Sequence, residues 1–179
     1  MKILNFKKID AFTKGAASGN PAGYVLMERP DALSEKEMQK LASELRGFVN
    51  EVGYVSRKDK QFTLKFYSSE CEVAFCGHAT IAIMYDLIST NPELLRETEL
   101  KIKVKGEVLS VFNHIKKEDA VYIMAPEPQF LEREISWNEI AEALQTDVAC
   151  FDRKKPFQLI DGGLRTLIVP TASRNACVG

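Results

Sequence analysis

Residues 68–80, Ser-Ser-Glu-Cys-Glu-Val-Ala-Phe-Cys-Gly-His-Ala-Thr, decide the fold that we predict for this chain. They lead into a helix whose residues up to Ile88 are almost all apolar, and a helix that is apolar on every face must be surrounded by protein. Its first turn would carry Cys76, Gly77 and His78 into the interior of the domain. Free backbone N–H groups and the positive end of the helix dipole meet there, which favours binding of a carboxylate.

The composition indicates an ordinary globular protein. Of the 179 residues, 45% are hydrophobic and 27% are charged, which suits one domain or two small lobes. A net charge of −1 without a basic cluster argues against a nucleic-acid partner. No apolar run approaches the roughly 18 residues of a membrane span, and the first residues lack the apolar core of a signal peptide. The four cysteines are too scattered for a disulfide scaffold, so we expect a cytoplasmic protein with reduced thiols and no membrane partner.

Local patterns predict the other elements of secondary structure. Ser34 and Glu37 form a capping box that opens an amphipathic helix, and Gly47 is the expected end of that helix. The central helix should end near residue 89, before a proline. Strands are expected at 3–12, 23–27, 51–56, 62–67, 72–75, 101–104 and 107–113, with a loop at 15–21 and a hairpin turn at 105–106.

A weak internal repeat indicates two similar lobes. Residues 121–144 repeat the order of residues 24–45, namely a strand, a loop with proline, a capping box and a short amphipathic helix. Ser136 and Glu139 form the second capping box. We therefore expect an α+β fold with an N-terminal lobe over residues 1–115 and a second lobe over 116–179, which is incomplete because no second central helix follows. Apolar strands within 157–170 would be exposed, which favours a homodimer.

Four short motifs follow one another along the chain: Asp10-Ala-Phe-Thr13, Gly19-Asn-Pro-Ala22, Glu51-Val-Gly-Tyr-Val55 and Cys76-Gly-His-Ala-Thr80. In this order and spacing they resemble the PhzF-like (phenazine biosynthesis) family, which shares the fold of diaminopimelate epimerase. The resemblance implies a β-roll or barrel wrapped around a central apolar helix. It also implies an isomerase or epimerase that uses no cofactor and moves a proton on a small carboxylated metabolite.

The resemblance further implies roles for individual residues. Glu51 would be the acid/base, and His78 would share the catalytic site with it. N–H donors and a helix dipole aimed at the substrate carboxylate would stabilise the charge that develops there, and partial burial of Glu51 would suit it for acid–base work near neutral pH. The residues expected to bind the substrate are Asn20, Cys76, Gly77 and Ala79.

Two questions about this assignment stay open at the level of the sequence. Cys76 is either a reactive base, as a cysteine at this place is in the epimerase branch, or a small buried residue that only packs. The chain also lacks the Asp-Pro-x-Thr-Gly-Ser-Ala-type motif that the family carries in its second lobe, so the sequence looks truncated. The alternative function is therefore a catalytically inactive family member that binds a ligand or dimerises.

Two other chemistries rank lower. A cysteine hydrolase built on Cys76 and His78 ranks last, because residues so close at a helix start are expected to point in different directions and no orienting Asn or Asp is evident. A zinc site formed by Cys71, Cys76 and His78 lacks a fourth ligand at a usual spacing, and His114 is remote. We therefore expect neither a metal ion nor a cofactor.

Overall fold

The computed structural model describes residues 3–14, 19–59 and 61–174. The chain divides into two compact units, Met1–Pro126 and Glu127–Gly179. The division lies after residue 126 and not between residues 115 and 116, because the strand Val121–Ile123 pairs with the preceding strand of the first unit through Val121 and Asn113. Within the described residues, no helix combines the length and the apolar character needed to cross a membrane.

The first unit is built on an eight-stranded mixed sheet. Its path runs β1-β2-β3-β4-β6-β7-β8, and β5 pairs with β4 beside this path. The pairs β2–β3 and β4–β6 are parallel, whereas the other neighbours are antiparallel. The strands are β1 (Phe6–Ala11), β2 (Asn20–Met27), β3 (Glu51–Lys58), β4 (Gln61–Ser68), β5 (Glu72–Val73), β6 (Glu99–Val104), β7 (Glu107–Asn113) and β8 (Val121–Ile123).

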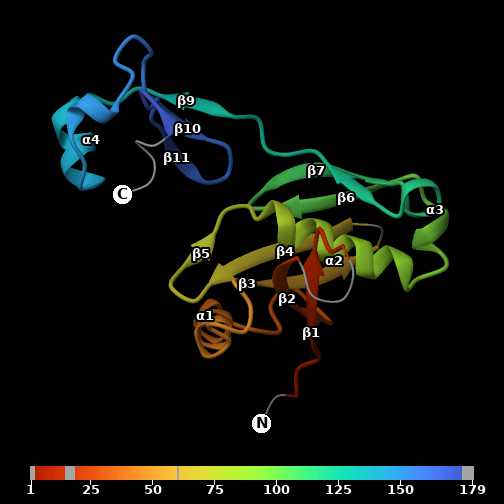
Figure 1. The fold of residues 1–179 in the computed structure, drawn as a ribbon. Helices are drawn as coiled ribbons and strands as arrows, with labels where there is room; N and C mark the ends of the chain where they lie inside the picture. Colours follow the sequence, from red (N-terminus) through yellow and green to blue (C-terminus); the bar gives the residue numbers. More distant parts are fainter. Residues whose placement is uncertain (1–2, 15–18, 60, 175–179) are drawn as a thin grey trace. The chain divides into compact units, whose positions relative to one another are not determined.

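The predicted central helix is confirmed as α2 (Gly77–Ser89), around which the sheet curls (Figure 1). Ile83 and Met84 are almost fully buried and belong to a core cluster with residues from β2, β3, β4, β6 and β7. At Gly53 of β3 an added Cβ would lie only 2.4 Å from Cδ1 of Ile83. The glycine thus allows β3 to approach the helix closely. The unit is a curled half-barrel of the α+β class, as the sequence predicts.

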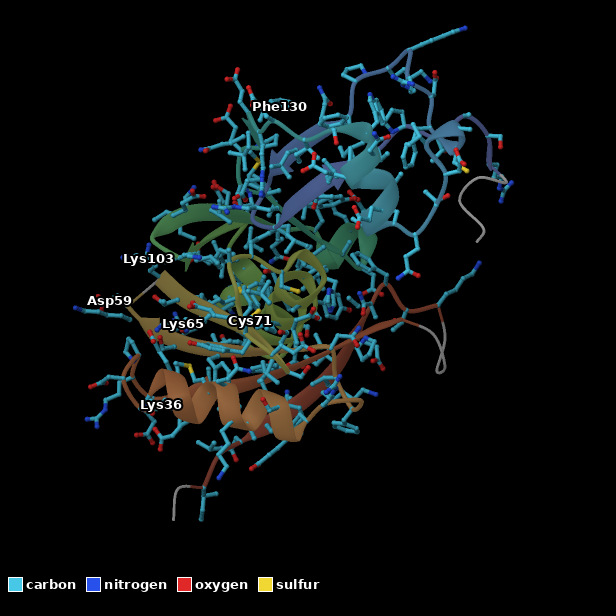
Figure 2. The ribbon with its side chains drawn as sticks, turned by 90° about the vertical axis from the view of Figure 1, so that its left-hand side faces the viewer. Lys36, Asp59, Lys65, Cys71, Lys103 and Phe130 are labelled. Atoms are coloured by element: carbon cyan, nitrogen blue, oxygen red, sulfur yellow. The ribbon has the colours of Figure 1, made fainter. Side chains whose placement is uncertain are left out.

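Helix α1 (Glu35–Glu44) covers the opposite face of the sheet, and its capping box between Ser34 and Glu37 is confirmed. Its buried residue Met38 packs in a second core cluster, and the Met38 carbonyl accepts a hydrogen bond from the Tyr54 hydroxyl at 2.6 Å. Lys65 of β4, which is labelled in Figure 2, forms an ion pair with Glu35 in the first turn of α1, at 3.6 Å. Because both faces of β3 are covered, five of its successive residues, 52–56, are buried.

The remaining turns of the first unit follow the local sequence. The predicted hairpin of β6 and β7 is confirmed, and Lys105 and Gly106 both adopt positive φ, as a tight two-residue turn requires. The predicted loop at 15–21 needs correction, since β2 already begins at Asn20, which pairs with Ala11; residues 15–18 lie outside the described residues. The short helices are η1 (Leu94–Arg96) and α3 (Ile115–Glu118).

In its described residues, 127–174, the second unit has a small antiparallel sheet and one α-helix. The sheet has the order β11-β10-β9. The second predicted capping box, between Ser136 and Glu139, is confirmed at the start of α4, where Ile140 packs with Phe151. Exposed apolar side chains include Phe130, which is labelled in Figure 2. The elements are β9 (Gln129–Leu131), α4 (Trp137–Ala143), η2 (Val148–Cys150), β10 (Gln158–Asp161) and β11 (Arg165–Ile168).

Candidate functional site

The strand order gathers several motif residues at one end of the large sheet. Glu51 begins β3 and pairs in register with Ala22, just beyond Asn20 at the start of β2. On its other side, Glu51 pairs with Ser68 at the end of β4. The side-chain amide of Asn50 donates a hydrogen bond to Oδ1 of Asn20 at 3.0 Å, which links the two parallel strands at this end. The Gly-Asn-Pro-Ala motif and the Glu51 motif are therefore neighbours in space.

The first turn of α2 faces the same end of the sheet. Cys76 is the N-cap residue and has an extended backbone, with φ −130° and ψ 103°. Among the residues that the structure describes, no side chain caps this helix end, so the N–H groups of its first turn are available to a ligand. At Gly77 an added Cβ would meet only the Phe75 ring, at 3.8 Å. Packing alone therefore does not demand a glycine there, whereas close approach of a ligand to the backbone would.

His78 connects the helix start to Glu51. Nε2 of its imidazole lies 3.2 Å from Oε2 of Glu51, and Nδ1 lies 3.4 Å from Sγ of Cys76. The side chains of His78 and Glu51 are 14% and 22% exposed, and Cys76 is 7% exposed. The imidazole thus stands between a thiol and a carboxylate in a largely buried cluster.

The contact between His78 and Glu51 is close but poorly aligned. Nε2 and Oε2 are at ion-pair distance, yet both atoms are fully enclosed and neither has a well-aligned hydrogen bond within the described part of the chain. The distance establishes an electrostatic contact, whereas the angle leaves hydrogen-bonding capacity unused on both atoms. Buried polar atoms normally find partners, and for these two atoms the nearest partner is each other, at 3.2 Å.

The two contacts of His78 raise its pKa to about 10. The hydrogen bond with Cys76 contributes most, the contact with Glu51 comes next, and burial acts in the opposite direction. The imidazole is therefore cationic at neutral pH. A positive charge beside free N–H groups at a helix start favours a bound anion.

The cluster also offers a sulfur, a nitrogen and an oxygen that could in principle hold a metal ion, with ligand atoms within 4.8 Å of one another. The three side chains are Glu51, Cys76 and His78, so the set differs from the one considered from the sequence, which included Cys71. However, the imidazole meets the thiol and the carboxylate through opposite ring nitrogens. A single metal ion cannot bridge the imidazole to both the thiol and the carboxylate unless the ring turns. A proton on each ring nitrogen satisfies both contacts as they stand.

The structure brings most of the predicted site residues together. Glu51, Cys76 and His78 are in contact, and Gly77 lies between the latter two. Ala79 follows in the first turn of the helix but has no exposed surface, neither side chain nor backbone, so it does not meet a ligand directly. Asn20 is joined to this end of the sheet through Asn50, which the sequence reasoning missed although Asn50 directly precedes Glu51.

One expectation from the sequence is wrong. Cys76 and His78 were expected to point in different directions, yet their side chains are in contact. The expectation assumed helical geometry for both residues, whereas Cys76 lies outside the helix with an extended backbone that turns its sulfur toward the first turn. His114 was expected to be remote from Cys71, Cys76 and His78. Its Nδ1 lies 3.0 Å from Oε1 of Glu118 in α3.

Comparison with known proteins decides the family. The family described as phenazine biosynthesis-like protein matches residues 9–179. The chain belongs to this family. It is 30% identical over 179 residues to the uncharacterized isomerase YfhB of Bacillus subtilis, covering 98% of this chain and 59% of that protein. An uncharacterized isomerase of Clostridium acetobutylicum is 42% identical over 88 residues, which are 48% of this chain and 28% of that protein.

Two solved structures agree with the fold. The Bacillus anthracis phenazine biosynthesis protein of the PhzF family has a TM-score of 0.73 at 29% identity, covering 99% of this chain and 58% of that one. A Pseudomonas aeruginosa protein described as a predicted epimerase has the same TM-score at 18% identity, covering 96% of this chain and 60% of that one, and supports the fold alone. The chain spans about three fifths of the length of YfhB and of these two proteins.

Proposed function

We propose that this chain carries the acid/base half of an isomerase site that moves a proton on a small carboxylated molecule. The observation that carries the proposal is the approach of Glu51 to within 3.2 Å of His78 at the uncapped start of α2. Membership of a family whose relatives are named isomerases supports the reaction class. The residues themselves support the roles below.

The start of α2 is proposed to bind the substrate carboxylate. The N–H groups of residues 77 and 78 and the helix dipole attract a negative charge, and the cationic imidazole of His78 adds to this attraction. Gly77 keeps the backbone accessible, since among the described residues the nearest atom to an added Cβ, apart from its chain neighbours and its own helix, is in the Phe75 ring at 3.8 Å. Asn20 offers a further donor, because its Oδ1 is engaged by Asn50 and its amide NH₂ is left for a substrate oxygen.

Glu51 is proposed to move the proton. As a carboxylate it removes a proton from the carbon beside the substrate carboxylate, so that the C–H bond breaks and an O–H bond forms on Glu51. The electron pair of the broken bond is delocalised onto the substrate carboxylate, whose added charge is stabilised by the N–H donors and by His78. Glu51 then delivers the proton to a second carbon over which this electron pair is also delocalised, so that the substrate is isomerised and Glu51 is again a carboxylate. This scheme involves no cofactor.

The substrate is open, so the test is a screen for hydrogen exchange. Small carboxylates are incubated with the full chain in D₂O, and deuterium incorporation next to the carboxylate is followed by NMR. We expect at least one compound to exchange with the wild type and not with Glu51→Gln, while the surface variant Glu107→Gln exchanges normally. Equal exchange by wild type and Glu51→Gln would remove Glu51 from the mechanism.

A further inference from the structure

The sulfur of Cys76 occupies an unusual position for an N-cap side chain. A residue at this place commonly accepts a hydrogen bond from an N–H group of the first helical turn, but the Cys76 side chain makes no such bond. Its sulfur instead lies 3.4 Å from Nδ1 of His78. The proposed proton transfer by Glu51 does not by itself require this contact.

The backbone of Cys76 is held in place from inside the helix. The Thr80 side chain is fully buried, and its hydroxyl donates a hydrogen bond to the Cys76 carbonyl at 2.7 Å. The Thr80 N–H donates to the same carbonyl at 2.9 Å. Two bonds to one carbonyl hold the backbone of the N-cap residue, from which the sulfur extends to within 3.4 Å of Nδ1 of His78.

A fixed partner at Nδ1 determines where the other ring nitrogen points. The two nitrogens lie on different sides of the imidazole, and the hydrogen bond at one of them sets the protonation and orientation of the other. With Nδ1 at the Cys76 sulfur, Nε2 is directed at Glu51. A ring without this partner would be free to rotate about its bond to Cβ and would withdraw Nε2 from the carboxylate.

We propose that Cys76 is a positioning residue, whose sulfur holds Nδ1 of His78 and thereby presents Nε2 to Glu51. In this role Cys76 neither attacks nor deprotonates the substrate. The inference deepens the proposed function, on which its catalytic meaning rests, but the contact itself is measurable without a substrate. It replaces both sequence-based alternatives for Cys76, the reactive base and the residue that only packs.

The test uses the imidazole resonances of the full chain, which contains only two histidines. Correlated ¹H–¹⁵N spectra of the rings give the protonation state of each nitrogen across a pH titration, and His114 serves as an internal reference. In the wild type we expect His78 to keep both nitrogens protonated well above pH 6.5. In Cys76→Ala we expect its midpoint to fall toward the ordinary value of about 6.5, with recovery in Cys76→Ser and no change in the exposed control Cys71→Ala.

Unchanged midpoint and ¹⁵N shifts of His78 in Cys76→Ala would overturn the proposal, because a residue that only packs would leave the ring chemistry intact. If Cys76→Ala does not fold, the wild type decides: a hydrogen-bonded Nδ1 at pH 8, whether it donates to the sulfur or accepts from the thiol, supports the proposal, and an Nδ1 without a hydrogen bond contradicts it. Where an exchanging carboxylate is known, Cys76→Ala should lower kcat more than it changes KM, and Cys76→Ser should restore part of the loss. If no carboxylate exchanges with the wild type, the proposed function is contradicted. The titration of the His78 ring tests the role of Cys76 independently of that outcome.

Discussion

Gly53 of β3 lies directly against Ile83 of α2, so closely that a Cβ on the glycine would be 2.4 Å from Cδ1 of the isoleucine. Both positions are at the centre of the first unit, where Ile83 is 1% exposed. Glu51 precedes Gly53 on the same strand, and His78 precedes Ile83 on the same helix. The close packing of strand and helix therefore sets the distance between the two side chains of the site.

Gly53→Ala should weaken both the fold and the site. The added methyl group overlaps a buried side chain, and overpacking of this kind costs about 1–3 kcal/mol of unfolding free energy. Chemical denaturation measures the loss. Gly162→Ala is the matched control, because nothing lies within 4 Å of its added Cβ. Equal stability of both variants would show that β3 and α2 are not in close contact.

Gly77→Ala should separate binding from stability. Its added methyl group meets only the Phe75 ring at 3.8 Å, so the unfolding free energy should change by less than about 0.5 kcal/mol. The methyl group nevertheless stands at the helix start where we place the substrate carboxylate, so affinity for an exchanging carboxylate should fall about tenfold or more, a loss of roughly 1.4 kcal/mol. Calorimetric titration would check this, and undiminished affinity would place the carboxylate elsewhere.

The stability of the fold should depend on pH through His78. Its pKa is raised to about 10 in the folded protein from 6.5, so protonation of His78 favours the folded state. This contribution is fully present below pH 6.5 and is lost as the pH rises through 10. The stability difference between wild type and His78→Gln should therefore shrink across that range. A difference that stays constant from pH 6 to pH 10 would contradict the raised pKa.

Phe12 is held in a strained backbone conformation at the end of β1. Its φ of 57° is in the left-handed region, which is unfavourable for an aromatic residue, and its side chain is 69% exposed. Phe12→Gly should relieve the strain and raise the unfolding free energy by about 1 kcal/mol. Phe48→Gly is the comparison, because Phe48 is also exposed but packs on Phe6, and its removal should lower stability. A loss of stability in Phe12→Gly would mean that the ring makes contacts worth more than the strain.

Local signals in the sequence were sufficient for much of the fold. Each capping box depends on residues three positions apart, Ser34 with Glu37 and Ser136 with Glu139, and both are present. The apolar helix and the turn at 105–106 are equally local features. The motif order also led to Glu51, Cys76 and His78, although their contact depends on strand pairing that no local pattern specifies.

Features that depend on distant pairing or on unusual backbone angles were missed. The bond from Asn50 to Asn20 exists only because β2 and β3 are parallel neighbours. Strand β8 was assigned to the second lobe because the repeat begins there, but its hydrogen bonds are with β7. The contact of Cys76 with His78 depends on the extended backbone at the N-cap, which the assumption of regular helical geometry does not anticipate.

The most direct test of the account measures binding and exchange in one variant. An exchanging carboxylate found with the wild type would be titrated into Glu51→Gln, and deuterium incorporation would be followed in the same samples. We predict that Glu51→Gln still binds the carboxylate at the start of α2 but incorporates no deuterium above the uncatalysed rate. Incorporation at the wild-type rate would show that another group moves the proton.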